Sequence, residues 1–366
     1  MKYALIGCGR ISPNHIEAAK NNSIEIAAIC DIVPDRMDIV AKTCNLSDSV
    51  IKYTDYKELI EKEHPELVAI ATESGTHFDI AFHCISCGCN VIIEKPIALS
   101  IEDADKLIAL AKEKNVLICV NHQNRFNKSI QYIRNAVENG RFGKLLQASA
   151  NILWNRNQSY YSAAAWRGTW AQDGGVLMNQ CIHNIDLLRW MMGNEIDEVF
   201  AYTDRLNHPY IEAEDFGAAL IKFSNGSYGI IHGTSNVFPK NLEETLYIFG
   251  ENATVKAGGK SVNKIEEWSF ADNLDNPEYV KSRYSEDVPD IYGYGHTPLY
   301  ADMIDAVKTG RAPYVSGEDG KRALELVLAI YKSAKEGQPV KLPLKKCSAL
   351  DFKGRFDNTE NQSNQL

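Results

Sequence analysis

The first 120 residues alternate short apolar runs with amphipathic segments, and this alternation limits the possible folds more than any other feature of the chain. The apolar runs have the length and composition of buried strands, and they lie at 2–8, 24–30, 67–71, 91–93 and 116–120. Between them lie segments with helical periodicity, of which 100–114 is the clearest. Alternation of strand and helix predicts an α/β fold with a doubly wound parallel sheet.

After about residue 121 the predicted strands follow a period of two residues. Residues 145–156 alternate apolar with mostly polar side chains, and two apolar runs flank Asn225-Gly226, a dipeptide typical of tight hairpins. The other predicted elements are strands at 216–223, 228–235, 246–249 and 253–256, and helices at 175–192, 298–309 and 320–336. We expect an antiparallel sheet with one covered and one available face.

The length and charge of the chain restrict its organisation and its partners. A chain of 366 residues exceeds the size of one hydrophobic core, and the change of pattern divides it into domains at 1–121 and 122–345. A polar tail follows at 346–366, which we expect to be disordered from about Lys353. The net charge of −9 argues against nucleic acid as a partner. Without a signal-like start or a run of roughly 20 apolar residues, we expect a cytoplasmic protein that does not cross a membrane.

Nine cysteines are scattered along the chain. Cys84, Cys87 and Cys89 are close enough in sequence to suggest a metal cluster, but no second pair of ligands follows at the spacing of a zinc site. We therefore expect reduced thiols and no metal.

A glycine-rich turn follows the first predicted strand. Gly7, Gly9 and the small Ser12 allow a tight turn that places a helix N-terminus against a pyrophosphate. The second strand ends at Asp31, where a carboxylate accepts hydrogen bonds from both ribose hydroxyls of adenosine and repels a 2′-phosphate. These residues predict a dinucleotide site that favours NAD over NADP, although Arg36 moderates the preference.

Glu94-Lys95-Pro96 ends the strand predicted at 91–93. A lysine at the carboxyl edge of a parallel sheet lies where open α/β folds bind their ligands. Lys95 is thus either one half of a structural ion pair with Glu94 or a cation that faces a substrate.

The helix predicted at 175–192 carries Asn179, His183 and Asp186 on one stripe. A single histidine on such a helix is either a satisfied core group or, opposite a lysine at a cofactor site, a general base. Asp186 and Asp173 are the two candidates for holding its tautomer. Just upstream, residues 154–170 are rich in aromatic and arginine side chains, which suits either a packed loop or recognition of an anionic, ring-bearing ligand.

Together, Gly7-x-Gly9-x-x-Ser12, the turn at 72–77, Glu94-Lys95-Pro96 and the Gly-Gly helix that leads to His183 resemble the glucose-fructose oxidoreductase/inositol dehydrogenase/MocA family over about residues 1–340. The resemblance implies a Rossmann domain followed by an α/β domain on a large, mostly antiparallel sheet. In that family the open face of the sheet commonly forms homodimers or homotetramers. The resemblance also implies oxidation or reduction of sugars, inositols and related polyols with NAD(P).

The resemblance implies roles for single residues as well. Those implied to bind the cofactor are Gly7, Gly9, Arg10, Ile11 and Asp31 at the adenosine and pyrophosphate end, Thr72, Ser74, His77, Glu94 and Lys95 at the nicotinamide end, and Gln123, Trp166 and Arg167 as further candidates there. Lys95 is also implied to face the substrate. The family's usual proline after Thr72 is absent, since Glu73-Ser74 stands in its place.

The stretch 154–180 resembles one branch of this family, the WlbA/WbpB-type dehydrogenases, which oxidise C3 of the glucuronate in UDP-N-acetylglucosaminuronic acid for bacterial surface polysaccharides. The implied substrate is an anionic UDP-sugar bound by Arg156, Tyr160, Tyr161, Gln180 and His183. Many family members have aspartate where this chain has Asn179, which orients a hydroxyl or an imidazole but cannot take up a proton. The role of base therefore falls on His183, while Lys95 stabilises the developing alkoxide.

Three alternatives stay open. A different sugar or inositol dehydrogenase would keep Lys95 and His183 without needing an anion-binding loop. A reductase would run the same chemistry in the opposite direction. The third alternative is a non-catalytic dinucleotide sensor on the same fold, which the presence of both residues disfavours.

Overall fold

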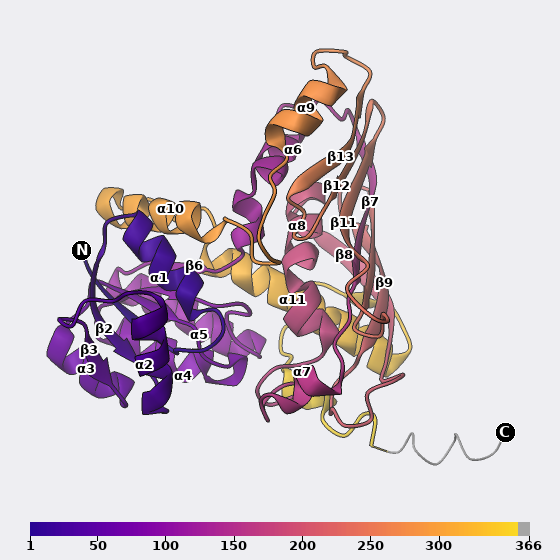
Figure 1. The fold of residues 1–366 in the computed structure, drawn as a ribbon. Coiled ribbons are helices and arrows are strands. Elements are labelled where there is room, and N and C mark those ends of the chain that lie inside the picture. The colour runs from indigo at the N-terminus through magenta and orange to yellow at the C-terminus, as the bar shows by residue number, and fades with distance from the viewer. Residues whose placement is uncertain (358–366) are drawn as a thin grey trace. The chain divides into compact units, whose positions relative to one another are not determined.

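The computed structural model describes residues 1–357, and within them the chain forms two compact units (Figure 1). The first unit comprises Met1–Ala98, Glu102–Gln123 and Tyr294–Lys321. The second comprises Leu99–Ile101, Asn124–Gly293 and the described residues from Arg322 onward. Residues 294–321, which the sequence analysis assigned to the second domain, therefore pack with the first unit.

The first unit is built on a six-stranded sheet with the order β3-β2-β1-β4-β5-β6, in which every pair of neighbours is parallel. Its strands are β1 (Lys2–Ile6), β2 (Glu25–Cys30), β3 (Ile51–Tyr53), β4 (Leu67–Ile70), β5 (Asn90–Ile93) and β6 (Ile118–Val120). All residues of β4 and β6 are buried, as expected for a sheet covered on both faces. The predicted doubly wound parallel sheet is confirmed, and only the short β3 was not predicted.

Helices connect these strands. They are α1 (Ser12–Asn21), α2 (Pro34–Thr43), α3 (Tyr56–Glu63), the short η1 (Ser74–Thr76), α4 (His77–Ser86) and α5 (Ile101–Lys114), with α10 (His296–Thr309) in the returning segment. The short η2 (Gln123–Phe126) begins at the last residue of this part of the unit and continues into the second unit. Helix α10 lies beside α1, where Asn22 Nδ2 donates to the carbonyl oxygen of Thr297 at 3.0 Å (Figure 1). The returning segment thus becomes part of the dinucleotide-binding unit.

The second unit contains an eight-stranded sheet with the order β13-β12-β11-β7-β10-β9-β8-β14. Its strands are β7 (Leu145–Leu153), β8 (Ile196–Asp204), β9 (Phe216–Phe223), β10 (Tyr228–Thr234), β11 (Glu243–Gly250), β12 (Ala253–Gly258), β13 (Lys264–Phe270) and β14 (Val340–Lys341). Only β7 and β10 pair in parallel, and Asn225-Gly226 turns β9 into β10 as predicted. The mostly antiparallel sheet of the prediction is confirmed.

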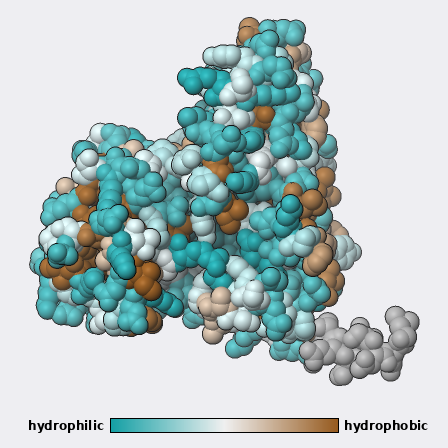
Figure 2. Space-filling model, viewed as in Figure 1, coloured by the Kyte–Doolittle hydropathy of each residue, from teal (hydrophilic) through white to brown (hydrophobic). Residues whose placement is uncertain are grey.

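One face of this sheet carries helices and the other is open. The helical segments of the unit are α6 (Lys128–Glu138), α7 (Gln158–Ser162), the π-helical η3 (Leu177–Cys181), α8 (Ile182–Met192), α9 (Pro277–Tyr284), α11 (Gly317–Glu336) and η4 (Ala349–Phe352). Helices α6, α8 and α9 lie along the covered face (Figure 1). On the open face Leu220, Tyr228 and Ile230 are 49, 45 and 44% exposed, and apolar residues gather along this side of the unit in Figure 2.

Residues 346–357 are part of the second unit. The rings of Phe352 and Phe356 are buried, and their centroids lie 5.8 and 6.5 Å from that of Trp170. The expected disorder from Lys353 is therefore wrong for residues 353–357, because two phenylalanines fix this segment in the core; residues 358–366 lie outside the described part. All nine cysteines are free thiols, and no helix within residues 1–357 is long and apolar enough to cross a membrane.

Candidate functional site

The turn after β1 approaches the neighbouring strand too closely for any residue but glycine at its start. Gly7 has a φ of +98°, and a Cβ there would lie 2.5 Å from the carbonyl oxygen of Ala71. Ser12, which replaces the third glycine, is buried and donates through Oγ to the carbonyl oxygen of Gly9 at 2.7 Å. The turn therefore closes on itself and leaves Gly9 and Arg10 exposed just before α1, where Rossmann folds bind the pyrophosphate.

Asp31 lies one residue beyond β2 and is 7% exposed. Its Oδ2 accepts the backbone N–H of Cys8 and its Oδ1 that of Val33, both at 2.9 Å, so the acid also ties the glycine turn to the end of β2. Each carboxylate oxygen has a second lone pair with which to accept a ribose hydroxyl. The guanidinium of Arg36 lies 3.7 Å from Oδ1, which supports the moderating effect predicted for it.

His77 links two turns at the ligand edge of the sheet. Its Nδ1 lies 2.7 Å from the carbonyl oxygen of Pro96 and its Nε2 lies 3.2 Å from that of Thr72. Burial lowers the pKa of the His77 imidazole, and the two backbone carbonyls oppose this shift. Thr72 is fixed further by the hydroxyl of Thr76 at 2.8 Å, while Ser74 is buried. The structure shows a linking role for His77, and its contact with nicotinamide stays a prediction.

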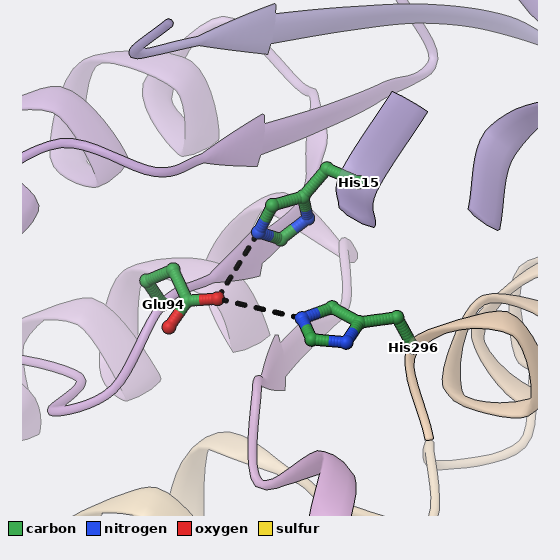
Figure 3. Close-up of side chains that lie close together, drawn as sticks. All are labelled: His15, Glu94 and His296. Atoms are coloured by element: carbon green, nitrogen blue, oxygen red, sulfur yellow. Dashed lines mark hydrogen bonds and ion pairs between the residues drawn. The ribbon is translucent and has the colours of Figure 1, made fainter. Parts of the chain in front are cut away.

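Glu94 lies directly after β5 and is 8% exposed. Its Oε1 lies 3.1 Å from Nε2 of His15 (Figure 3). The same oxygen accepts a hydrogen bond from Nδ2 of Asn121, while Oε2 accepts the backbone N–H of Lys95 at 3.3 Å. Burial favours the neutral acid, but contacts with His15 and His296 outweigh it and hold the pKa of the Glu94 carboxyl well below its usual range. Histidine and amide groups, rather than the lysine side chain, surround this carboxylate.

Gln123 is a buried residue whose side-chain oxygen is not hydrogen-bonded within residues 1–357. It is 3% exposed, and its Oε1 has no hydrogen-bond partner there. A buried acceptor of this kind is suited to a ligand. With the glycine turn, Asp31 and the edge of β5, the first unit therefore offers residues that fit a dinucleotide along the whole carboxyl edge of its sheet.

The helix predicted at 175–192 begins with the π-helical turn η3, which the sequence analysis did not predict. Glycines in the strands beneath it allow a very close approach. A Cβ at Gly233 would lie 2.5 Å from Sγ of Cys181, and one at Gly217 would lie 2.6 Å from Cδ1 of Leu177. Such π-turns within helices are frequent at functional sites, because they change which side chains face outward.

Glu214 holds the first turn of this helical segment. Its carbonyl oxygen accepts the N–H of Val176 at 3.0 Å, and its Oε1 accepts the N–H of Leu177 at 2.9 Å and the hydroxyl of Tyr331 at 2.8 Å. A Cβ at Gly175 would lie 1.8 Å from its Oε2, so only glycine fits there. Burial raises the pKa of Glu214 to about 8, which makes it a neutral group at neutral pH.

Asn179 and His183 are the only residues from Val176 to Met192 that are not buried. They lie one turn apart, as predicted. The side-chain amide of Asn179 donates to Asp173, whose other oxygen accepts the backbone N–H of Gly168 at 2.7 Å. The residue in place of the family's aspartate is thus oriented by a carboxylate six positions before it.

Asp186 belongs to a buried ion cluster. Its oxygens accept Nε and Nη2 of Arg125 at 2.6 and 2.7 Å and Nη2 of Arg189 at 3.0 Å, and all three residues are at most 1% exposed. Of the two acids considered for orienting His183, one therefore binds two arginines and the other binds Asn179.

Cationic and aromatic side chains gather around Tyr160. The guanidinium carbons of Arg156 and Arg167 lie 5.0 and 4.2 Å from the centre of its ring, and its hydroxyl accepts Nε2 of Gln180 at 3.2 Å. Trp166 is half-buried, with its ring 5.3 Å from the Arg167 guanidinium. These residues form the arginine–tyrosine cluster, Arg156, Tyr160, Arg167 and Gln180.

Tyr161, the neighbour of this cluster, has its hydroxyl bonded to Ser235 Oγ at 3.2 Å. The ring is buried, and burial raises the pKa of its phenol above the usual value. The substrate contact implied for Tyr161 stays a prediction, and the bond to Ser235 shows a structural role.

The sequence analysis missed His15, Asn121 and His296 around Glu94. One signal for His15 was present, since Ser12, His15 and Ile16 share the buried stripe of α1 and a histidine is unusual on such a stripe. Nothing in the sequence pairs it with residues more than 100 positions away.

Comparison with known proteins agrees with this architecture. Residues 1–122 match the family model described as "Oxidoreductase family, NAD-binding Rossmann fold", and residues 134–342 match "Oxidoreductase family, C-terminal alpha/beta domain". Among curated proteins, the myo-inositol 2-dehydrogenase of Thermotoga maritima is 29% identical over 93% of this chain and 98% of its own length.

Solved structures of higher identity are also similar. The WlbA dehydrogenase of Bordetella pertussis, in complex with NADH and UDP-GlcNAcA, is 35% identical with a TM-score of 0.86 over 94% of this chain and 98% of its own. The WlbA dehydrogenase of Chromobacterium violaceum, with the same two ligands, is 34% identical with a TM-score of 0.86 over 94% and 96%. With both family models matched across most of its length, the chain belongs to the glucose-fructose oxidoreductase/inositol dehydrogenase/MocA family of NAD-dependent oxidoreductases.

Proposed function

We propose that the protein oxidises the C3 hydroxyl of a UDP-linked N-acetylamino-sugar uronate with NAD⁺, as a step in the synthesis of surface polysaccharides. The observation that carries this proposal is the arginine–tyrosine cluster. Two guanidinium groups within 5.0 Å of one tyrosine ring concentrate positive charge that a neutral polyol does not need. A diphosphate and a uronate carboxylate both use such groups, since arginine binds these anions through paired N–H donors. The similarity to WlbA dehydrogenases crystallised with UDP-GlcNAcA supports the same substrate class.

The proposed chemistry divides between three side chains. His183 takes the proton of the C3 hydroxyl, which suits an imidazole because its pKa lies near the working pH. Lys95 stabilises the alkoxide that develops by its fixed positive charge. Asn179, held by Asp173, orients the hydroxyl or the imidazole. The bound NAD⁺ supplies the hydride acceptor.

The cofactor roles proposed for the first unit follow its geometry. Gly9, Arg10 and Ile11 contact the pyrophosphate at the start of α1, and Asp31 binds the adenosine ribose. Glu94 and Lys95 reach the nicotinamide ribose, with Thr72, Ser74 and Gln123 nearby. Trp166 and Arg167 are proposed for the nicotinamide end, although Arg167 belongs to the arginine–tyrosine cluster and cannot serve cofactor and substrate equally.

We further propose that the open face of the eight-stranded sheet joins copies of this chain into a homodimer or homotetramer. Its exposed apolar side chains, among them Leu220, Tyr228 and Ile230, have the character of an interface core. Sedimentation of the purified protein tests this: a monomer at micromolar concentration would contradict it.

A second candidate is an inositol or free-sugar dehydrogenase, which the similarity to the myo-inositol 2-dehydrogenase favours. A substrate screen separates the two. The purified protein is mixed with NAD⁺ and UDP-GlcNAcA, UDP-GlcNAc, free glucuronate or myo-inositol, and the near-ultraviolet absorbance of reduced nicotinamide is followed. Absorbance with UDP-GlcNAcA alone supports the proposal. Turnover of myo-inositol without turnover of the UDP-uronate overturns it.

A further inference from the structure

The carboxylate of Glu94 lies at the centre of a buried cluster supplied by four separate segments. His15 comes from α1, Glu94 and Asn121 follow β5 and β6, and His296 begins α10. Figure 3 shows His15, Glu94 and His296. Nε2 of His15 lies 3.1 Å and Nε2 of His296 lies 3.9 Å from the same carboxylate oxygen, Oε1. All four residues are at most 8% exposed, so water screens their interactions little.

The donors and acceptors in this cluster indicate which atom of each hydrogen bond carries the proton. An ionised carboxylate only accepts, so His15 donates through Nε2. When the ring is neutral, its Nδ1 is the acceptor and faces the hydroxyl oxygen of Tyr300 at 2.7 Å. Tyr300 then donates to His15 and accepts the hydroxyl proton of Tyr3 at 3.0 Å. Burial raises the pKa of both phenols, so both keep the protons that this order requires. The chain of bonds runs from Tyr3 through Tyr300 and His15 to Glu94.

The hydrogen bonds around Glu94 argue against a metal ion at this position. The ligand atoms of His15, Glu94 and His296 lie within 4.8 Å of one another, a spacing that suits a divalent cation. However, the side-chain amide of Asn121 donates to Glu94 and lies 3.0 Å from Nε2 of His296, so it occupies the gap between them. His15 also presents a proton, rather than a lone pair, toward the carboxylate.

The two oxygens of Glu94 are therefore unequal. Oε1 accepts from His15 and Asn121, whereas Oε2 accepts only the backbone N–H of Lys95, at 3.3 Å, within residues 1–357. Glu94 follows β5 at the carboxyl edge of the parallel sheet, the edge at which such sheets bind dinucleotides. Oε2 is the oxygen with capacity left for a ligand hydroxyl.

We propose that His15 is a positioning residue for the cofactor: held by Tyr300, it fixes the ionised Glu94 carboxylate so that Oε2 accepts a hydroxyl of the bound dinucleotide. This inference rests on the cofactor role proposed for Glu94. It also gives a function to the returning segment at 294–321. Helix α10 supplies Tyr300 and His296, and thus completes a dinucleotide-binding unit that begins nearly 300 residues earlier in the chain.

The affinity for NADH, measured by fluorescence titration of the purified full chain, tests this order. His15→Leu removes the donor to Glu94 and should weaken NADH binding roughly 10-fold or more, as loss of a bond to a charged group does. His15→Gln keeps an amide N–H near the position of Nε2 and should recover much of that affinity. Tyr300→Phe, which no longer fixes the tautomer, should weaken binding by roughly 3-fold. Tyr53→Phe is the matched control, because it removes a phenol hydroxyl bonded to Glu63 elsewhere in the same unit.

The pH profile separates positioning from a general effect on folding. In the unaltered protein NADH binding should be flat between about pH 5 and pH 8, because Glu94 stays ionised. In His15→Leu, one of the contacts that lower the pKa of Glu94 is lost, while burial still raises it. NADH binding should therefore weaken as the pH falls and the Glu94 carboxyl takes up a proton. The titratable groups around Glu94 are His15, His296, Tyr300, Tyr3, His77 and Lys95.

The outcomes are distinguishable. Unaltered affinity in Glu94→Gln would overturn the cofactor role of Glu94, and with it this inference. Weakened binding in Glu94→Gln with unaltered binding in both His15→Leu and His15→Gln would overturn the inference alone. If His15→Leu fails to fold, the NADH affinity of Tyr300→Phe is compared with that of Tyr53→Phe. Equal affinities of these two variants would overturn the positioning role of His15. Stoichiometric zinc binding that disappears in His15→Gln would replace the proton order by a metal site.

Discussion

In the first unit the buried carboxyl of Glu94 is held charged, whereas in the second unit Glu214 and Glu244 are just as buried and neutral. Glu94 meets two imidazoles and an amide, and its pKa lies well below the usual range although burial opposes this. Burial raises the pKa of Glu214 and Glu244 to about 8 each. Glu214 accepts only from a backbone N–H and a phenol, and Glu244 meets the amide of Asn124 at 3.4 Å.

The difference between the units comes from partners rather than from depth. Moving a carboxylate out of water favours the neutral acid, and only basic or strongly donating neighbours reverse this. The first unit provides such neighbours for Glu94, at the edge where a ligand hydroxyl needs an acceptor. In the second unit Glu214 anchors a helix, for which a neutral carboxyl suffices.

The largest effect is expected from the residues proposed to carry out the chemistry. Lys95→Ala in the first and His183→Ala in the second should each lower kcat by roughly 10²–10⁴-fold, as loss of a positioned acid–base group does. Asn179→Ala should cost less than His183→Ala, because an amide orients but does not take up a proton. Steady-state kinetics with UDP-GlcNAcA check this, with the midpoint of urea unfolding as the control for folding. The reverse order of Asn179 and His183 would make the histidine a bystander.

Asp186 extends the comparison of buried carboxyl groups, because it lies in the second unit and is charged. It is charged because Arg125 and Arg189 bind it directly. Asp186→Ala leaves two buried guanidinium groups without their carboxylate and should lower the free energy of unfolding by about 3–5 kcal/mol. Urea unfolding measures the loss. Glu138→Ala is the control, since it breaks an exposed pair with Arg134 and should cost under about 1 kcal/mol; equal losses would contradict the account.

In the second unit, we expect the arginine–tyrosine cluster to supply the positive charge that binds the ligand. Arg156→Gln should raise the KM for UDP-GlcNAcA by roughly 10–100-fold, because a hydrogen bond from a cation to an anionic ligand is lost. The KM for NAD⁺ should stay unchanged, since Arg156 is not proposed to bind the cofactor. An unchanged KM for the UDP-uronate would remove Arg156 from the substrate site and favour a neutral substrate.

The last prediction concerns the neutral state of Glu214. Its carboxyl ionises at an ordinary pKa of 4.5 in the unfolded chain and at about 8 in the folded one. Between these values the folded state holds a proton that the unfolded state has lost, so stability falls as the pH rises, by up to about 1.4 kcal/mol per pH unit. Glu214→Gln should flatten this slope in urea unfolding between about pH 5 and pH 8, with Glu244 still contributing its own. An unchanged slope would mean that Glu214 is charged.

Sequence patterns predicted most of the fold because the decisive signals are local. The apolar runs and the hairpin at Asn225-Gly226 each follow from a few adjacent residues. Strand β3 was not predicted because it has only three residues, of which Ile51 and Lys52 are exposed and give no apolar run. The ordered structure of residues 353–357 was not predicted because Phe356 packs on Trp170, about half a chain away in sequence.

The site was predictable only where a motif carries the chemistry. Glu94, Lys95 and Asp31 stand at strand ends, and His183 stands one turn after Asn179. His15 was not predictable, because its function depends on Tyr300, which reaches it through the returning helix α10. The π-turn that exposes Asn179 was not predictable either, since it depends on small residues in strands that follow it in the chain.

We propose that this oxidoreductase removes hydride from C3 of a UDP-linked uronate. UDP-GlcNAcA carrying deuterium at C3 tests this when the protein is incubated with unlabelled NAD⁺ and the products are examined by mass spectrometry and NMR. We expect deuterium at C4 of the reduced nicotinamide and a 3-keto sugar without it. Unlabelled NADH together with a product that keeps its deuterium, or no reduction of NAD⁺ at all, would rule out hydride transfer from C3.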